Sequence, residues 1–438
     1  MENLAQVPQA MQRVLNEEAR QAGFVTGFVQ RQSKLTAELF TQTTVFGWMA
    51  NPEATLEELT QTAAVLGLKI KPQGLDQRFS EEAAQCLRRG LQSAVAQVIG
   101  SSQPAIEVLK RYKGVYLEDA SIVRLPDQLA PIWTGCGGSS AEGLNSSVKL
   151  EVRLDYLTGR LFGPNLMDGK KHESNAQLSK VKLPAGSLWL VDLGYFGLNR
   201  LEQLHLEKVH WLTRVKTGTG IVDEFNREWE LGAFLRSQNS NQIDVKIKLG
   251  VRKQLSCRLI AVKAPQEAVN QRRLRLRDQA RRKCSKASKE SLALAEWTVY
   301  ITNLESEQLT IDEALVLVRV RWQIELLFKL WKSHCRIDES RSNNEWRNLC
   351  EFYAKLIGAV IKHWILITSC WHIPDRSLFK AVQTVQKFTF SLAIAFTSVE
   401  LLSDLIVKIK DCISSGCRIN KRKKAPSNFQ LLLAKSLA

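Results

Sequence analysis

The order of strands and helices between residues 115 and 215 restricts the fold of this chain more than any other feature. Strand patterns, either apolar and β-branched or alternating, cover residues 115–123, 148–154, 160–162, 188–191 and 211–215. A helix is expected to follow residue 197 and to end near residue 206. This order predicts an α/β fold with a mixed sheet.

The strand at residues 148–154 alternates strictly between apolar and polar residues. Its polar side carries Lys149, Glu151 and Arg153. Successive side chains of a strand point to opposite faces of its sheet. We therefore expect one face of this strand in the core and the other facing water or a ligand.

Two acidic residues lie on neighbouring early strands of the predicted sheet. Asp119 lies inside the first strand, and Asp192 directly follows the apolar strand at residues 188–191. A third acid, Glu325, lies within residues 310–332. That segment predicts one long helix, because no Gly or Pro interrupts it and Thr310 with Glu313 has the spacing of a capping box.

The face of this helix that carries Glu325 also carries Arg321 and Lys332. One interpretation is an ordinary surface ion pair between Arg321 and Glu325. The other makes Glu325 a metal ligand and places Arg321 and Lys332 on a phosphate. The second interpretation requires two further carboxylates, and Asp119 and Asp192 are the candidates.

Asp119, Asp192 and Glu325 together have the chemistry of a metal site. Three carboxylates are costly to bring together unless cations compensate their charge. Mg²⁺ prefers oxygen ligands, with Mn²⁺ as the expected substitute. Two such ions activate a water or a 3′-hydroxyl and stabilise the leaving oxygen during displacement at phosphorus. We therefore predict a two-metal site for phosphoryl transfer.

An excess of basic residues favours a nucleic-acid partner. The chain has 61 Lys and Arg against 44 Asp and Glu, a net charge of +17. Residues 271–289 hold nine Lys or Arg and one acid, which indicates contact with DNA or RNA or, alternatively, a solvated charged helix. We predict DNA contacts for basic residues inside this run and for one outside it, Arg214. Those inside the run are Arg272, Arg273, Arg275, Arg277, Arg281, Arg282 and Lys283.

The cysteines and the apolar segments bear on the compartment. Nine cysteines, an odd number without a C-x-x-C pair, predict reduced thiols in the cytosol. Residues 1–23 lack the apolar region of a signal peptide. Residues 356–370 are too short to span a bilayer and contain Lys362 and His363, so we expect no membrane partner and a structural role for His363.

Changes in composition and the positions of turn-forming residues divide the 438 residues into five regions. We expect a helical DNA-binding domain at residues 1–108, whose residues 54–79 are compatible with a helix-turn-helix or with any αα-hairpin. Residues 109–215 and 305–370 form the core, interrupted by an antiparallel β-subdomain at residues 216–304. Residues 371–438 are helical and end in a basic cluster at residues 418–424. Smaller expected features are a glycine-rich loop at residues 134–143 and a short helix at residues 173–179.

Jointly, these motifs resemble the DDE transposases of the insertion-sequence-4 group. Their Tyr-x2-Arg-x3-Glu-x6-Lys signature fits Arg321, Glu325 and Lys332, although Val318 occupies the Tyr position and lacks its hydroxyl. The context of the first acid matches in Ser121 and Leu125-Pro126. The context of the second matches in Gly194-Tyr195-Phe196, and the YITN segment at residues 300–303 also fits.

The resemblance implies an RNase H-like core and Mg²⁺-dependent cleavage at the element's terminal inverted repeats, followed by strand transfer into target DNA. It also implies a homodimer, for which residues 371–438 are the candidate dimerisation region, acting in a synaptic complex on the bacterial nucleoid. Trp297 matches a tryptophan that stabilises a flipped base, although a buried strand residue is equally compatible. The alternatives are a catalytically silent DNA-binding repressor or domesticated transposase, and a nuclease without strand transfer.

Overall fold

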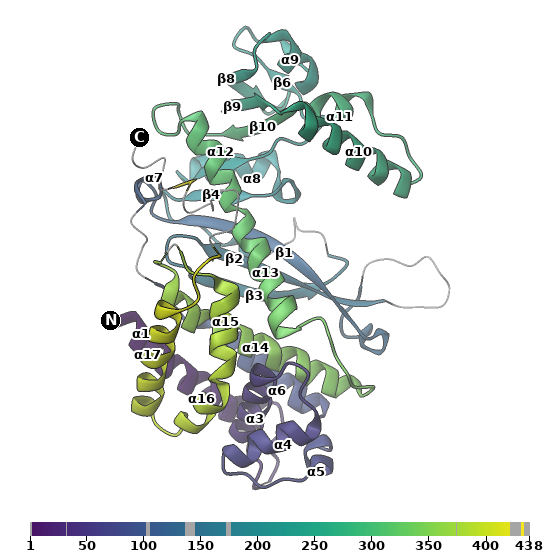
Figure 1. Ribbon diagram of the computed structural model, residues 1–438. Coiled ribbons are helices and arrows are strands. Elements are labelled where there is room, and N and C mark those ends of the chain that lie inside the picture. Colours follow the sequence, from purple (N-terminus) through teal and green to yellow (C-terminus); the bar gives the residue numbers. More distant parts are fainter. Residues whose placement is uncertain are drawn as a thin grey trace. The chain divides into compact units, whose positions relative to one another are not determined.

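Figure 1 shows the computed structural model, which describes residues 2–31, 33–101, 106–135, 145–171, 177–373, 375–420 and 431–432. The chain divides into two compact units built from non-consecutive stretches. Unit 1 takes residues 1–105, 119–180 and 323–430, and unit 2 takes residues 106–118, 181–322 and 431–438. The predicted loop at 134–143, helix at 173–179 and basic cluster at 418–424 lie mostly outside the described residues.

Unit 1 is mainly helical, as predicted for both ends of the chain. Its N-terminal helices are α1 (Glu2–Gln12), a π-helical segment (Arg13–Glu18), α2 (Ala19–Val25), α3 (Ala37–Ala50), α4 (Leu56–Val65), α5 (Pro72–Asp76) and α6 (Glu81–Ala96). Its C-terminal helices are α13 (Trp322–Cys335), α14 (Glu345–Cys370), α15 (Leu378–Lys387), α16 (Thr389–Ala395) and α17 (Val399–Ser415). The predicted pair at residues 54–79 is α4 and α5, joined through Gly67 at φ +84°. Its role in DNA reading stays a prediction.

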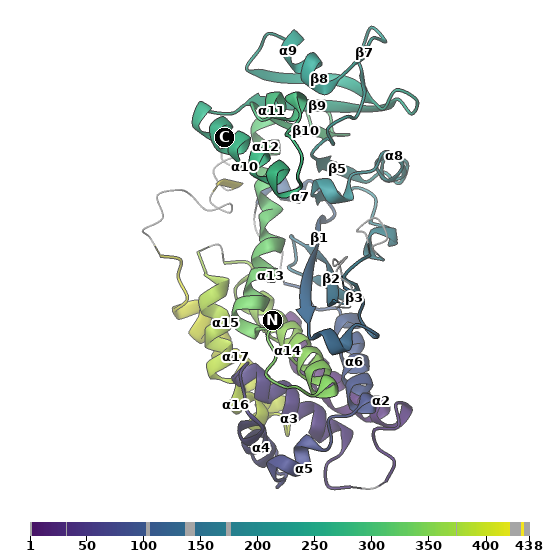
Figure 2. The same ribbon diagram turned by 90° about the vertical axis from the view of Figure 1, so that its right-hand side faces the viewer.

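Helix α14 forms the centre of unit 1 and packs against α1, α3, α6, α15 and α17 (Figures 1 and 2). It is buried along nearly its whole length, including its polar residues. Lys355 Nζ lies 2.7 Å from Glu351 Oε1. His363 Nε2 lies 2.8 Å from the carbonyl oxygen of Gly159 and donates to it. Burial lowers the pKa of His363 to about 4, so the ring is neutral and has a structural role.

Strand β2 (Ser146–Asp155) pairs in antiparallel fashion with β3 (Leu161–Asp168) in unit 1. Every residue of β2 is buried, so the expectation of a face exposed to water or ligand is wrong. Its polar side chains Lys149, Glu151 and Arg153 bond instead to main-chain groups that follow β3. The carboxylate of Glu151, for example, accepts the N–H of Leu178 at 2.9 Å. The chain itself therefore covers the polar face.

Unit 2 contains a mixed sheet with the strand order β1-β4-β5-β10-β9-β8-β6-β7. The strands are β1 (Val115–Leu125), β4 (Leu188–Val191), β5 (His210–Thr213), β6 (Ile221–Val222), β7 (Glu228–Trp229), β8 (Gln242–Leu249), β9 (Leu255–Lys263) and β10 (Trp297–Thr302). β1, β4 and β5 run parallel, and the other neighbouring pairs are antiparallel. The predicted α/β fold with a mixed sheet is confirmed. From residue 119 onward β1 belongs to unit 1, where the order is β3-β2-β1.

The helices of unit 2 are α7 (Glu107–Lys110), α8 (Leu198–Leu206), α9 (Leu231–Ser237), α10 (Gln266–Arg282), α11 (Lys289–Leu294) and α12 (Ile311–Val320). Helix α8 connects the parallel strands β4 and β5, a connection that parallel strands require. The strands predicted within residues 216–304 are antiparallel and continue the same sheet, because β10 pairs with β5. The five predicted domain boundaries stay a prediction.

The single helix expected at residues 310–332 is instead two helices, α12 and α13. The capping box at the start of α12 is present, since Thr310 and Glu313 each bond to the other's main-chain N–H. At Arg321 the main-chain N–H donates to the carbonyl of Val318, three residues back, at 3.3 Å. This tighter turn interrupts the i to i−4 ladder of an α-helix, although Arg321 keeps right-handed helical angles.

Two further expectations concern the cysteines and the membrane. Every cysteine in the described part of the chain is a free thiol, whereas Cys136 lies outside it. In the same residues no helix combines the length and apolar character needed to cross a membrane.

Candidate active site

Asp119 and Asp192 each come directly after the last paired residue of the parallel strands β1 and β4. The last register pair between β1 and β4 joins Glu118 to Val191. Asp119 is the next residue of β1, and Asp192 is the next residue after β4. Both side chains are half-buried. Asp192 follows the carboxyl end of β4, a place that commonly carries ligand-binding residues in α/β proteins, whereas β1 continues beyond Asp119 to Leu125.

The local structure of β4 fixes where Asp192 stands. The four apolar residues of β4 are all buried, and Asp192 then begins a 3₁₀ turn, Leu193–Tyr195. The N–H of Tyr195 donates to the main-chain oxygen of Asp192 at 3.1 Å. The side chain of Asp192 does not cap this turn, so the backbone conformation does not depend on its carboxylate.

Helix α13 carries Glu325 in its first turn and is tied to strand β1 within unit 1. Lys332 Nζ donates to the carbonyl oxygen of Ile122 at 3.0 Å. The rise along helix α13 from Glu325 to Lys332, seven residues, is about 10 Å. The rise along strand β1 from Asp119 to Ile122, three residues, is also about 10 Å. Lys332 therefore has a main-chain partner here, which a phosphate oxygen could replace.

The three candidate acids do not all belong to one unit. Asp119 and Glu325 fall in unit 1, and Asp192 falls in unit 2. Nowhere in the described part of the chain do three or more His, Cys, Asp or Glu side chains gather as a metal site. The set of metal ligands thus stays a prediction. Arg321 lies in unit 2 at the end of α12 and is half-buried.

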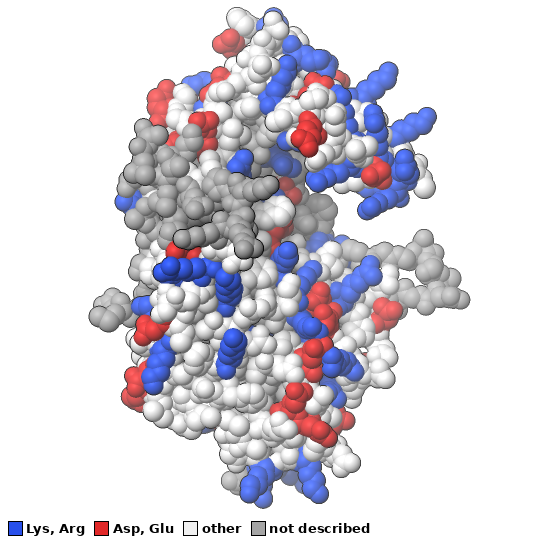
Figure 3. Space-filling model, in the orientation of Figure 1, with Lys and Arg blue, Asp and Glu red and all other residues white. Residues whose placement is uncertain are grey.

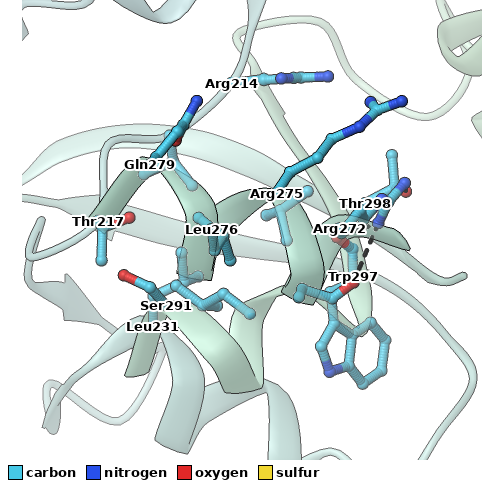
Figure 4. A pocket seen from close by; sticks show the side chains of 14 residues that line it. Arg214, Thr217, Leu231, Arg272, Arg275, Leu276, Gln279, Ser291, Trp297 and Thr298 are labelled. Atoms are coloured by element: carbon cyan, nitrogen blue, oxygen red, sulfur yellow. Dashed lines mark hydrogen bonds between the residues drawn. The ribbon is translucent and has the colours of Figure 1, made fainter. Parts of the chain in front are cut away.

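A second region, wholly within unit 2, brings together four of the residues predicted to contact DNA. A pocket of about 440 Å³ is lined by Arg214, Arg272, Arg275 and Trp297 (Figure 4). Arg214 directly follows β5, the other two arginines lie on α10, and Trp297 begins β10. Leucines of α9, α10 and α11 also line the pocket, so it combines cationic and apolar walls.

Arg272 is held rigidly at the edge of this pocket. Its Nη1 donates to the carbonyl of Trp297 at 3.0 Å, and its Nη2 donates to the hydroxyl of Thr298 at 2.8 Å (Figure 4). Burial lowers the pKa of Arg272, and the like charge of Arg214 lowers it further. Two guanidinium groups that repel one another in a pocket favour an anionic ligand between them.

Trp297 is buried, with its ring close to a second cation. Only 7% of its surface is exposed, and Lys263 Nζ lies 5.5 Å from the ring centroid. An ammonium group at this distance over an indole face makes a cation–π contact. Trp297 is therefore a buried strand residue of β10 and also part of the pocket wall, while its role in stabilising a flipped base stays a prediction.

The remaining basic residues of residues 271–289 divide into two groups. Arg273 is half-buried, and its Nε donates to the carbonyl of Leu292 at 3.1 Å while its Nη2 contacts Glu296 at 2.6 Å. The others are exposed and make no ion pair with another described residue. They are Arg277, Arg281, Arg282, Lys283, Lys286 and Lys289.

The sequence interpretation missed several polar residues of the pocket wall. Thr217, Ser291 and Gln279 line the pocket beside the arginines. Gln279 follows Arg275 by four residues on α10, so helical spacing alone would have put both on one face. Thr217 and Ser291 come from distant parts of the sequence, and no local pattern marks them.

Comparison with known proteins identifies the family. Residues 113–361, more than half of the chain, match the transposase DDE domain family. The chain belongs to this family. It is 24% identical over 400 residues to the transposase for insertion sequence element IS231F of Bacillus thuringiensis subsp. israelensis, a match covering 84% of this chain and 82% of that protein. It is 25% identical over 367 residues to the transposase for insertion sequence element IS1151 of Clostridium perfringens, covering 78% and 76%.

The transposase DDE domain of this chain contains every residue of the candidate site. The match starts two residues before β1 and ends within α14. It therefore includes Asp119, Asp192 and Glu325, together with the whole arginine-lined pocket. Helices α1 to α6 and α15 to α17 lie outside the matched residues.

Proposed function

We propose that the chain is the transposase of an insertion sequence, which binds the terminal inverted repeats, cleaves the DNA ends and transfers them into target DNA. The observation that carries the proposal is the β1–β4 register, after which Asp119 and Asp192 are the next residues. Membership of the transposase DDE domain family supports it. The mixed sheet and the Arg321–Glu325–Lys332 spacing support the finer assignment to an RNase H-like core of the insertion-sequence-4 group.

Asp119, Asp192 and Glu325 are the proposed ligands of two Mg²⁺ ions. The donor set fits the metal, because carboxylate oxygens are its preferred protein ligands and all three side chains are half-buried and therefore accessible. When bound, the ions supply an activated water or 3′-hydroxyl and stabilise the leaving oxygen. The three carboxylates would supply the negative charge and the oxygen ligands of that site. Mn²⁺ is the expected substitute for Mg²⁺.

The cationic residues are the proposed DNA contacts. Arg321 and Lys332 hold the phosphate next to the reacting bond, with Lys332 exchanging its contact with Ile122 for a phosphate oxygen. The pocket beside Trp297 accepts a base displaced from the duplex, with Arg214 and Arg272 near its phosphate. The exposed cations Arg282 and Lys283 at the end of α10 neutralise backbone charge. A homodimer in a synaptic complex completes the proposal.

The test uses duplex DNA carrying the inverted repeats that flank the gene, incubated with purified protein and Mg²⁺ or Mn²⁺. The parent protein should cut at the repeat ends. Asp119→Asn, Asp192→Asn and Glu325→Gln should each lose several kcal/mol of transition-state stabilisation, a rate loss of at least about a hundredfold. Asp338→Asn, at an exposed acid just beyond α13, is the matched control and should cut normally.

The same reactions separate the alternatives. DNA binding without cutting by the parent protein would indicate a silent repressor or domesticated transposase. Cutting without joining of pre-cut ends to a target plasmid would indicate a nuclease. Cutting by all three acid variants at the parent rate would refute the proposed metal ligands.

A further inference from the structure

Helix α10 has two faces of different character. Its inner face is fixed to unit 2 through Val269, which is 2% exposed, and through the hydrogen bonds of Arg272 and Arg273 to residues 292–298. The half-buried positions 268, 272, 276 and 280 recur every four residues along this side. The inner face therefore holds the helix in place without using its outer side chains.

The outer face of α10 is exposed along its whole length and contains more than cations. Its members, three, four or seven positions apart, are Glu267, Asn270, Gln271, Leu274, Arg277, Asp278 and Arg281. Figure 3 shows Lys and Arg side chains gathered over the surface formed by α10. Two of these seven residues are arginines, two are amides, one is apolar and two are acidic.

This composition does not suit a face that contacts only phosphates. Leu274 is 58% exposed in the middle of the helix and has no attraction for a phosphate. The carboxylate of Asp278, one helical turn away, would repel one. The same side chains do suit base edges: Arg pairs with guanine, Asn or Gln with adenine, Asp with the amino group of cytosine, and an apolar group with the methyl group of thymine.

We propose that the outer face of α10 lies in the major groove of duplex DNA and reads its sequence. This inference rests on the proposed transposase function, which supplies DNA as the partner. The helix has 17 residues, a length of about 25 Å, and the major groove is about 12 Å wide, enough for one helix. Duplex RNA is not the partner, because side chains cannot read its deep and narrow major groove. The exposed cations Arg282 and Lys283 at the end of α10 contact the flanking phosphates.

A charge-conserving substitution distinguishes base reading from phosphate contact. Arg277→Lys keeps the positive charge but loses the bidentate geometry that recognises guanine. Selection of bound duplexes from a randomised library, followed by sequencing, gives the base preference of the parent and the variant. Arg277→Lys should relax the preference at one base pair and weaken binding to the best sequence about tenfold. The salt dependence of binding should stay the same, since no charge is lost.

Two further variants complete the experiment. Leu274→Ala should relax a preference for thymine at a neighbouring base pair, with no change in salt dependence. Arg252→Lys, at an exposed arginine in the turn between β8 and β9, is the matched control and should retain the parent preference. If Arg277→Lys and Leu274→Ala both select the parent's sequences, the inference is wrong and the proposed function stands. If the parent itself binds no duplex DNA, both are wrong.

Discussion

Strand β2 and helix α10 both carry charged residues at regular spacing, but the fold treats them in opposite ways. The polar side chains of β2 are buried and bond to main-chain groups of the same unit. On α10 only the inner arginines do so, and the outer face remains exposed. Regular spacing therefore identifies which residues share a face, whereas the neighbouring segments decide whether that face meets protein or solvent.

The difference has an energetic meaning that experiments can measure. A buried carboxylate that accepts main-chain N–H groups stabilises the fold, because its loss leaves those donors unsatisfied. An exposed cation contributes little to stability, because water solvates it equally well before and after folding. Charged residues of the first kind should affect unfolding, and those of the second kind should affect binding.

The largest effect is expected for Glu151→Ala in β2. The N–H groups of Gln177 and Leu178 would lose their acceptor in a buried site, at a cost of at least about 3 kcal/mol in the free energy of unfolding. Urea unfolding measures the change. Glu228→Ala, at an exposed position of β7, is the control and should shift stability by less than about 0.5 kcal/mol. Equal losses of unfolding free energy in the two variants would contradict the expected difference between buried and exposed charged residues.

A smaller effect is expected from pH, through the burial of His363 beside the turn that joins β2 and β3. Burial lowers the pKa of His363 to about 4, from 6.5 in the unfolded chain. Between these values the unfolded chain binds a proton that the folded protein does not. The contribution of the neutral His363 ring to the free energy of unfolding is complete above pH 6.5. It is lost as the pH falls toward 4, on the order of 3 kcal/mol in total.

Urea unfolding at pH 7 and pH 4.5 checks this expectation against His363→Gln. The Gln side chain retains a donor for the Gly159 carbonyl but does not titrate. The variant should lose less stability than the parent over this range. The same loss in both proteins would assign the pH dependence to other groups.

The smallest effect is expected within α10, where Arg273 and Arg277 form a matched pair. Arg273→Ala removes hydrogen bonds to Leu292 and Glu296 and should cost about 1 kcal/mol of stability. Arg277→Ala should leave stability within about 0.5 kcal/mol but reduce the salt slope of DNA binding by no more than about 0.9. Thermal unfolding and binding at several salt concentrations separate the two. A stability loss at Arg277 would show that the outer face also holds the fold.

Much of the fold could be predicted because it depends on local patterns. The strands β4 and β10, the turn after Asp192 and the capping box at Thr310 follow from residues within a few positions of one another. Strand β1, which contains Asp119, follows from the same kind of local pattern, as does strand β4, which Asp192 follows. The roles of these acids as metal ligands stay a prediction.

The interruption at Arg321 could not be predicted, because no Gly or Pro marks it and Arg321 retains helical angles. The burial of Glu151 depends on residues more than twenty positions away, which cover the polar face. The pocket likewise joins Arg214, Arg272 and Trp297 from three separate elements. Such features depend on long-range contacts, which leave no local trace in the sequence.

The sequence by itself determined the α/β class of this chain, the strands that carry two of its acids and the basic character of residues 271–289, since these depend on composition and short-range periodicity. Only the tertiary structure decided which charges are satisfied by the protein and which remain exposed. Desolvation depends on everything packed around a group. Arg272 and Arg277 are five residues apart on one helix, yet Arg272 bonds to the carbonyl of Trp297 and Arg277 remains exposed.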